Sequence, residues 1–316
     1  DALPIYLTGT LTDLTRSTRP GNRQPLGPAT GREPGSTMTK TLKCVDLFSG
    51  CGGLSLGLRA AGFKERLAVE NSEMPAETNY HNLIKPIEDV DRWKLEHVGA
   101  DLSKQVEMGL VVSELGKLLE RDDLVKSIAD EGIDLVAGGP PCQGFSMAGR
   151  RNPEDARNQL PWQFLKFVEA VKPKAVIIEN VSGMKSDFVK HGKRSPFVEL
   201  QDALRETGSG YVVQPLLLNA RHFGAPQNRP RLFLVGIARD IASKLGITVS
   251  GGLWSSANDD GRVIASEDGR PRLAPRRTHF TKPELQRLGR DADRHEELVV
   301  GDALFDLLER KASARS

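Results

Sequence analysis

Residues 45–58 read VDLFSGCGGLSLGL, in which a short apolar run ends at a glycine-rich turn and is followed by leucines at helical spacing. A strand, a tight turn and a helix in this order are typical of the first unit of a parallel α/β sheet. Glycines let the backbone approach a ligand closely, and the N-terminus of the following helix attracts negative charge. We therefore expect a ligand site at the carboxyl end of this strand.

Alternating strand and helix patterns extend along the chain from this turn. Apolar runs predict strands over 42–48, 66–70, 133–137, 174–179, 211–218 and 231–237. Helical spacing predicts helices over 54–61, 73–81, 114–130, 160–171 and 196–207. The charged stretch 84–132 is interpreted as an inserted helical segment, and the pattern fades after Ile237. The fold class expected is α/β, a Rossmann-like, doubly wound, mostly parallel sheet.

The composition suits a soluble globular protein, with 38% hydrophobic and 27% charged residues. There is no long apolar run and no signal pattern, so we expect a cytoplasmic protein without a membrane span. Three cysteines without CxxC spacing fit a reducing compartment and argue against structural zinc, so no metal site is expected. The net charge of +2 leaves a nucleic-acid partner open, because basic residues can gather on one face.

Cys142 lies in the stretch GGPPCQGFS, residues 138–146, directly after the expected strand 133–137. The prolines stiffen a loop at the sheet edge where open α/β folds place reactive groups. A thiol is a nucleophile only as thiolate, which free backbone N–H groups favour. The alternative is a small apolar side chain that fills space behind a turn. The flanking Pro-Cys-Gln favours the nucleophile.

Charged residues also stand at the ends of other expected strands. Glu70 ends a strand 24 residues after Asp46, where a carboxylate can accept hydrogen bonds from a ribose. This pattern alone suits NAD, FAD or S-adenosylmethionine, although GxGG in place of GxGxxG disfavours dinucleotides. Glu179 ends the apolar run AVIIENV, and QNRPR at 227–231 precedes another strand. Taken singly, such residues are more often solvated surface charges.

The joint order DLFSGCGG, PPCQGFS, ENV and QNRPR resembles the C5-cytosine DNA methyltransferases. The resemblance covers about Lys43 to Ile237 and continues more weakly to about Glu309. It implies that the chain transfers the methyl group of S-adenosylmethionine to C5 of a cytosine flipped out of double-stranded DNA, as part of a restriction–modification system. A nucleoid-associated cytoplasmic enzyme would follow from it.

The resemblance implies four catalytic residues. Cys142 would attack C6 of the cytosine, and Glu179, buried and protonated, would donate to N3. Arg231 would contact O2 of the base, and Arg229 would steady the site or a phosphate.

The resemblance also assigns binding residues. The glycine-rich turn would hold S-adenosylmethionine with Phe48 against the adenine, Glu70 would hold the ribose, and Pro140 would line the methionine end. The full cofactor set is Asp46, Phe48, Ser49, Gly50, Cys51, Gly52, Gly53, Leu54, Glu70, Asn71, Asp89, Val90 and Pro140. A mobile loop would close over DNA and phosphates. The DNA-binding set is Gln143, Ser146, Arg150, Arg151, Arg157 and Gln227.

The domain organisation follows from the same resemblance. Residues 1–37 lack periodicity and are interpreted as a disordered leader or an artificial extension. Residues 38–240 are expected to form the catalytic domain, and 241–316 an incomplete start of a target-recognition region. A later Gly-Asn-Ser-Val word of the family is missing from this sequence.

Three accounts of the missing word remain open: one half of a split enzyme with a second polypeptide, a fragment, or a non-catalytic remnant. We expect the chain alone to be weakly active at best. A tRNA cytosine methyltransferase of the same fold and a subunit that only binds cofactor or DNA are the rival functions. A nicotinamide dehydrogenase has no support beyond the glycine turn.

Overall fold

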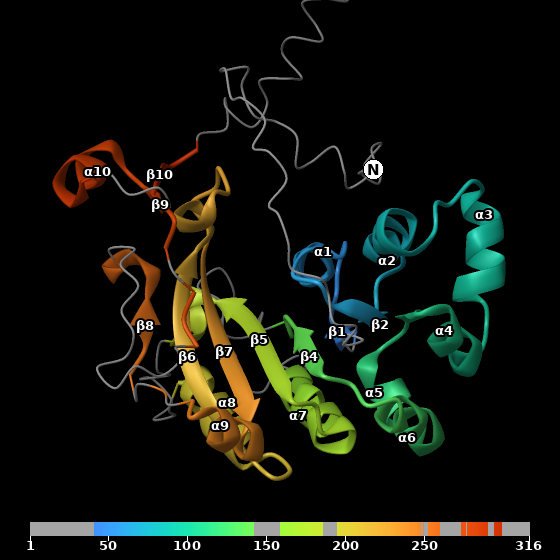
Figure 1. Ribbon diagram of the computed structural model, residues 1–316. Coiled ribbons are helices and arrows are strands. Elements are labelled where there is room, and N and C mark those ends of the chain that lie inside the picture. The colour runs from blue at the N-terminus through green and yellow to red at the C-terminus, as the bar shows by residue number, and fades with distance from the viewer. Residues whose placement is uncertain are drawn as a thin grey trace, which may run out of the picture.

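A computed structural model describes residues 41–141, 159–185, 195–247, 249, 252–259, 273–275, 277–289 and 294–298. In this part of the chain, eight strands form one sheet in the order β3-β2-β1-β4-β5-β7-β6-β8 (Figure 1). The strands are β1 (Lys43–Leu47), β2 (Lys64–Glu70), β3 (Leu110–Val112), β4 (Leu135–Gly138), β5 (Ala175–Val181), β6 (Tyr211–Asn219), β7 (Pro230–Ala238) and β8 (Trp254–Ser255). A separate pair joins β9 (His279–Phe280) to β10 (His295–Glu296).

The large sheet is parallel except for β7, which runs antiparallel to both β5 and β6. In an antiparallel pair, the start of one strand lies beside the end of the other. The amino end of β7 therefore lies at the same edge as the carboxyl ends of β1, β4 and β5. This single reversal brings the residues before β7 to the edge where a doubly wound sheet places its ligands.

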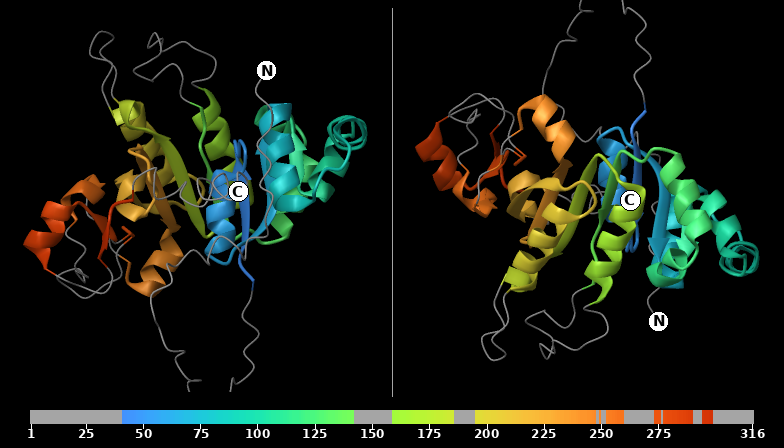
Figure 2. Two further views of the ribbon diagram at one scale, coloured as in Figure 1. Left: turned by 90° about the horizontal axis from the view of Figure 1, so that it is seen from above. Right: turned by 90° about the horizontal axis from the view of Figure 1, so that it is seen from below.

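Helices cover both faces of the sheet (Figure 2). The larger core packs one face under α5 to α8, while α1 and α2 cover smaller apolar clusters on the other. Phe164 and Phe167 of α7 are fully buried in the larger core, and burying each stabilises the fold by roughly 1.5–3 kcal/mol. The helices are α1 (Gly53–Ala60), α2 (Glu73–Asn79), α3 (Val90–Trp93), α4 (Leu102–Met108), α5 (Leu115–Leu119), α6 (Asp122–Asp130), α7 (Leu160–Val171), α8 (Pro196–Glu206), α9 (Arg239–Leu245) and α10 (Lys282–Leu288).

Shorter turns complete the described chain. Two are π-helical, η1 (Tyr80–Ile84) and η2 (Lys94–Val98), and three are 3-10 turns, η4 (Ser182–Lys185), η6 (Ala220–Phe223) and η7 (Ser256–Asn258). No described helix is long and apolar enough to cross a membrane.

The predicted fold class is confirmed, but three predictions about its parts are wrong. The stretch 84–132 is not wholly helical, because Leu110–Val112 forms β3 and pairs with β2. A strand of three residues between helices is too short to show a period of two. The helix expected over 114–130 is two helices, α5 and α6, which break at Glu120 and Arg121. After Ile237 the pattern does not end, since α9 follows β7 directly.

Candidate active site

The turn after β1 has an unusual backbone conformation. Phe48 has φ of 59°, and Gly50 and Gly52 have φ of 53° and 86°. A phenylalanine with positive φ is strained, and such strain is concentrated at ligand sites. At Gly52 a Cβ atom would stand 2.5 Å from the Cδ1 atom of Leu83, so another residue would need both a strained φ and a shift of the Leu83 side chain.

Glu70 ties this turn to the end of β2. Its Oε2 atom accepts a hydrogen bond from the Gly50 N–H at 2.9 Å, and its Oε1 atom accepts one from the Ser72 N–H at 2.8 Å. Each carboxylate oxygen can accept more than one hydrogen bond, so both keep capacity for the hydroxyls of a ligand. The carboxylate thus stands at the turn as the sequence predicts for a ribose contact.

The turn has a second support that the sequence analysis missed. Asn79 at the end of α2 is fully buried, and its Nδ2 donates to the Ser49 hydroxyl at 3.1 Å. The Asn79 Oδ1 atom is buried and has no hydrogen-bond partner among the described residues. The sequence signal was an asparagine at the end of a predicted helix, and its burial, which is rare for asparagine, becomes visible only in the structure.

Asp46 lies beneath the turn, on the side of β1 that α1 covers. It is 1% exposed, and its Oδ2 atom lies at hydrogen-bond distance, 2.6 Å, from the Ser55 hydroxyl oxygen. Burial raises the pKa of Asp46 to about 7. The same Ser55 Oγ lies 2.7 Å from Oε1 of Glu65, whose other oxygen pairs with Arg59 at 2.7 Å. Ser55 and Glu65 were not among the predicted site residues.

The remaining predicted cofactor residues occupy different environments. Cys51, Gly53, Asn71 and Asp89 are exposed, while Leu54 and Val90 are half-buried. The Asp89 carboxylate caps α3 by accepting the Arg92 N–H at 3.0 Å, so one of its oxygens is already engaged. Pro140 is buried at the opposite side of the turn, at the end of β4.

The loop after β4 is fixed by the end of β5. Asn180 is 5% exposed, and its Nδ2 donates to the Pro140 carbonyl at 3.1 Å. A Cβ atom on Gly139 would stand 3.0 Å from Oε2 of Glu179, so the loop passes close over that carboxylate. Asn180 was not among the predicted site residues. Its signal was a polar side chain on the buried face of an otherwise apolar strand.

Glu179 and Arg231 form an ion pair across β5 and β7, with Arg231 Nε 2.9 Å from Glu179 Oε1. The register sets Val181 opposite Arg231, which makes Glu179 its diagonal neighbour on the same face. The Glu179 side chain is 28% exposed, so the expectation that it is buried is wrong. The carboxyl is half-exposed because it lies at the open edge of the sheet. Its neighbour there is the Arg231 guanidinium and not a set of apolar side chains.

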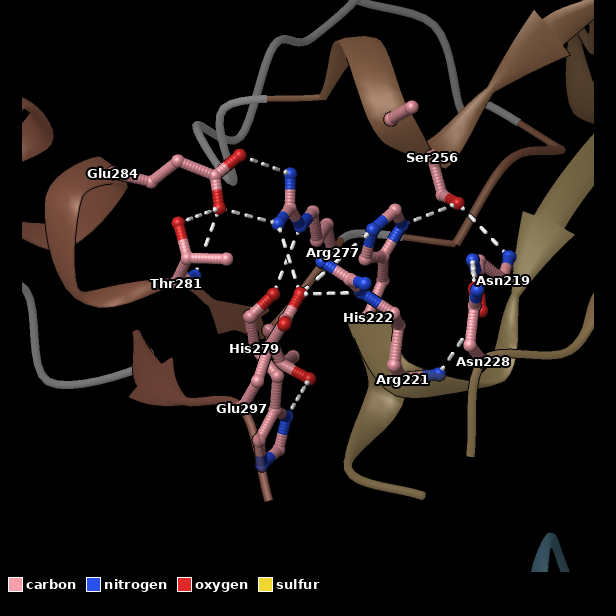
Figure 3. Close-up of polar contacts among 12 residues, drawn as sticks. Asn219, Arg221, His222, Asn228, Ser256, Arg277, His279, Thr281, Glu284 and Glu297 are labelled. Atoms are coloured by element: carbon pink, nitrogen blue, oxygen red, sulfur yellow. Dashed lines mark hydrogen bonds and ion pairs between the residues drawn. The ribbon is translucent and has the colours of Figure 1, made fainter. Parts of the chain in front are cut away.

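Arg229 and Gln227 are exposed on the loop before β7. The Oδ1 atom of Asn219, at the end of β6, accepts the Arg229 N–H at 3.0 Å. Its Nδ2 donates to Oδ1 of Asn228 at 2.8 Å, so one side chain spans the loop (Figure 3). The loop's backbone is therefore held while the Arg229 side chain remains free to meet a ligand.

The predicted nucleophile and most DNA contacts lie outside the described residues. They are Cys142, Gln143, Ser146, Arg150, Arg151 and Arg157. Pro141, the residue before Cys142, is exposed at the sheet edge next to the Asn180–Pro140 hydrogen bond. The structure thus brings the turn after β1, the loop after β4, Glu179 and Arg231 to one edge.

Comparison with known proteins agrees with this arrangement. The family model for C-5 cytosine-specific DNA methylases matches residues 42–282. The Type II methyltransferase M.DdeI of Desulfomicrobium norvegicum is 34% identical over 201 residues, which cover 63% of this chain and 41% of that protein. The Type II methyltransferase M.HindV of Haemophilus influenzae is 33% identical over 62% of this chain and 53% of its own length.

Another relative is matched over more of its length. The Type II methyltransferase M.AquIA of Picosynechococcus is 35% identical over 61% of this chain and 71% of that protein. The chain spans about half the length of the first two relatives. A solved structure of an E. coli prophage DNA modification methyltransferase is 29% identical with a TM-score of 0.48, over 66% of this chain and 49% of that one.

Proposed function

Because the chain belongs to the C-5 cytosine-specific DNA methylases, we propose that it transfers a methyl group from S-adenosylmethionine to C5 of cytosine in double-stranded DNA. The observation that carries the proposal is the edge of the sheet, where Glu179 and Arg231 pair beside the loop that leads into Cys142. A nucleophile, an acid and a cation are the groups that this substitution requires, and the acid and the cation lie together at this edge.

S-adenosylmethionine fits the turn after β1. The left-handed Phe48, the two glycines with positive φ and the Glu70 carboxylate make a cradle beside the N-terminus of α1. Glu70 would hold the ribose with its remaining acceptor capacity, and Phe48 would lie against the adenine. The bound cofactor supplies the electrophilic methyl group. Asp46 would support this turn from below through Ser55, rather than by direct contact.

The proposed chemistry begins at Cys142. Its thiolate adds to C6 of cytosine, and a proton from Glu179 reaches N3, so that electron density rises at C5. In the pair seen here the Glu179 carboxylate accepts from Arg231. Arriving base would therefore separate the pair: Arg231 turns to O2, and Glu179 takes up the proton that it donates to N3. After methyl transfer, water takes up the C5 proton, the thiolate leaves C6 and N3 returns its proton to Glu179, which restores the aromatic ring.

The target base must leave the duplex, since C6 is not accessible to a side chain within the base stack. Arg229 and Gln227 are exposed beside Arg231 and would meet phosphates or the flanking bases. We assign residues 38–240 to catalysis and the following residues to the beginning of a target-recognition region, which further protein, on this or a second polypeptide, would complete. The relatives are named Type II methyltransferases, which supports a role in a restriction–modification system, and a DNA substrate would place such an enzyme at the nucleoid.

The experiment that tests the function is trapping on duplex DNA that contains 5-fluorocytosine. Fluorine at C5 cannot leave as a proton does, so an enzyme of this type stays covalently bound to the base after methyl transfer. We expect a product of the mass of protein plus DNA with the wild-type chain and none with Cys142→Ala. Adduct formation by Cys142→Ala would contradict the assigned nucleophile.

A further inference from the structure

The described chain after β7 returns to pack against the loop between β6 and β7. We name residues 277–289 and 294–298 the returning segments (Figure 3). Their backbone is joined to η6 directly, because the Thr278 N–H donates to the His222 carbonyl at 3.1 Å. They are joined to each other as well, since the Glu297 N–H donates to the Phe280 carbonyl at 3.0 Å.

The contact between the returning segments and this loop is tight. Gly224 closes η6 with φ of 88°, and a Cβ atom there would stand 2.8 Å from the His279 ring. Phe280 is fully buried beneath the same contact. A side chain at position 224 would require a strained backbone and a shift of the His279 ring, so the loop and the returning segments are in close contact.

Arg277 is the centre of the returning segments. It is 2% exposed, which is rare for arginine and requires full compensation of its charge. Its two terminal nitrogens donate to the two carboxylate oxygens of Glu284 at 3.0 and 2.8 Å, and its Nε donates to the His279 carbonyl at 2.8 Å. The guanidinium also lies 4.4 Å over the Phe280 ring, a cation–π contact.

Glu297 links Arg277 to the loop. One oxygen, Oε1, accepts from Arg277 at 3.4 Å and from the Arg221 Nε at 3.0 Å, and Arg221 belongs to η6. Two guanidinium groups thus face two carboxylates, those of Glu284 and Glu297. The charge of this cluster is balanced when His222 is neutral, and burial followed by the Arg277 charge lowers the pKa of His222.

A second set of hydrogen bonds leads from His222 to the loop before β7. His222 Nδ1 lies 2.8 Å from the Ser256 hydroxyl, which accepts the Asn219 N–H at 3.0 Å. Asn219 in turn accepts the Arg229 N–H at 3.0 Å. Hydrogen bonds also run from Arg277 through Glu297 and Arg221 to Asn219, since the Asn219 Oδ1 atom accepts the Arg221 N–H at 3.4 Å as well as the Arg229 N–H (Figure 3).

We propose that Arg277 is a positioning residue for residues 226–231, the loop before β7 and the first two residues of that strand, which it holds in place through Glu297, η6 and Asn219. The inference rests on the proposed function in one respect, namely that this loop presents Arg229 and Arg231 to the base. We infer further that the returning segments, which lie far along the chain from Cys142 and Glu179, set the positions of Arg229 and Arg231. A role confined to stability would affect the loop no more than the rest of the sheet.

The first test measures amide hydrogen exchange in the full chain with Arg277→Met. We expect the amides of Asn219 and Arg229 to exchange at least about tenfold faster, while those of β4 and β5 change less than about twofold. Arg239→Met is the matched control, because it removes an arginine–glutamate pair at the other end of β7. Unchanged exchange at Asn219 and Arg229 would overturn the proposal, as would equal acceleration throughout the sheet.

A second variant guards against local unfolding in Arg277→Met. Arg221→Met breaks the link to Glu297 from the side of η6 and leaves the Arg277–Glu284 pair intact. Its side chain is 36% exposed, so its loss leaves no cavity. We expect the same local acceleration at Arg229 in this variant, and its absence there would also count against the proposal.

The catalytic arm separates this inference from the proposed function. We expect both variants to lower the rate of 5-fluorocytosine adduct formation at least about tenfold, with affinity for S-adenosylmethionine kept within about twofold. Normal adduct rates in variants with accelerated loop exchange would show that the loop needs no such positioning. Failure of the wild type to form adduct would strike the proposed function, while the exchange experiment would still decide the inference.

Discussion

Arg231 Nε lies 2.9 Å from Glu179 Oε1, and the two side chains stand on neighbouring strands that run in opposite directions. Since every other described strand that meets β5 or β1 is parallel, only the reversal of β7 brings a residue that begins a strand beside one that ends a strand. Under the proposed function, this pair must open so that Arg231 can meet O2 of the base and Glu179 can meet N3.

Glu179→Gln should keep a hydrogen bond to Arg231 but lose the proton donor. We expect the rate of adduct formation on 5-fluorocytosine DNA to fall by about 10²- to 10⁴-fold, the usual size of a general-acid contribution. Single-turnover kinetics would measure it. Glu206→Gln, which alters an exposed carboxylate paired with Arg239, is the control. Equal rates in Glu179→Gln and the wild type would remove Glu179 from the chemistry.

Asp46 and Glu65 share one hydroxyl, since Ser55 Oγ lies 2.6 Å from one carboxylate and 2.7 Å from the other. A hydroxyl carries one hydrogen, so one of the two carboxyls must carry a proton. Glu65 pairs with Arg59, and burial, as the largest effect, raises the pKa of Asp46 to about 7, so the proton belongs to Asp46. The neighbouring charges of Glu65 and Glu70 also raise the pKa of Asp46, although the Ser55 hydrogen bond lowers it.

The sign of the pH dependence follows from this raised pKa. The folded value of about 7 exceeds the ordinary 3.8, so the stability that the protonated group allows is lost as pH rises through 7. Asp46→Asn should abolish that loss. The free energy of unfolding of the variant, relative to the wild type, should therefore be higher at pH 8 than at pH 4 by on the order of 3 kcal/mol. Urea denaturation at both pH values measures the difference.

Asp134 provides the contrast for that experiment. It is 4% exposed but is ion-paired with Lys174 and accepts the Lys43 N–H at 2.9 Å. Asp134→Asn should therefore destabilise the protein at pH 8, where Asp46→Asn stabilises it. Destabilisation of Asp46→Asn at pH 8 by as much as Asp134→Asn would mean that Asp46 is ionised in the folded protein.

Gly52→Ala should damage the cofactor turn by collision as well as by backbone strain. Its Cβ atom would stand 2.5 Å from Leu83, whereas Gly62, with a similar φ of 91°, has open space around it. We expect Gly62→Ala to cost about 1 kcal/mol of stability and Gly52→Ala about 1–3 kcal/mol more. Isothermal titration should show affinity for S-adenosylmethionine reduced only in Gly52→Ala. Equal affinities in the two variants would place the ligand elsewhere.

Asn180→Asp removes the donor to the Pro140 carbonyl without changing side-chain volume. The buried carbonyl would lose its partner and face a carboxylate, which costs about 1–3 kcal/mol. We expect a lower melting temperature and slower formation of the covalent adduct between Cys142 and 5-fluorocytosine DNA. Asn82→Asp, which loses a donor to the Thr78 carbonyl on the far side of the turn, should slow adduct formation much less. The reverse order of the two effects would contradict a role in positioning.

The sequence predicted the elements with strong patterns and missed the relations between them. The apolar runs of β1, β4 and β5 are typical of buried strands and predict no other element. The turn after β1 was predicted from Gly50 and Gly52. The three residues of β3 carry no periodic signal, so the pairing with β2 decides their structure. Short strands are assigned by their partners, which a linear pattern does not contain.

The site was predicted residue by residue but not in its contacts. Glu179 and Arg231 are 52 positions apart, and their pairing depends on the direction of β7, which apolar runs do not encode. The predicted burial of Glu179 was wrong for the same reason, since Arg231 occupies the space that an apolar wall would fill. Asn180 and Arg277 were overlooked because a buried polar residue acquires its role only from the partner that the fold supplies.

The most direct test of the proposed function maps the covalent bond to 5-fluorocytosine DNA by peptide mass spectrometry. The wild-type chain is incubated with the duplex and S-adenosylmethionine, beside Cys142→Ala and a protein-only control. We expect the modified base on the peptide that contains Cys142 and on no other, and no adduct with Cys142→Ala. An adduct on Cys51 or another residue, or no adduct from a chain shown to bind both cofactor and duplex, would contradict the account.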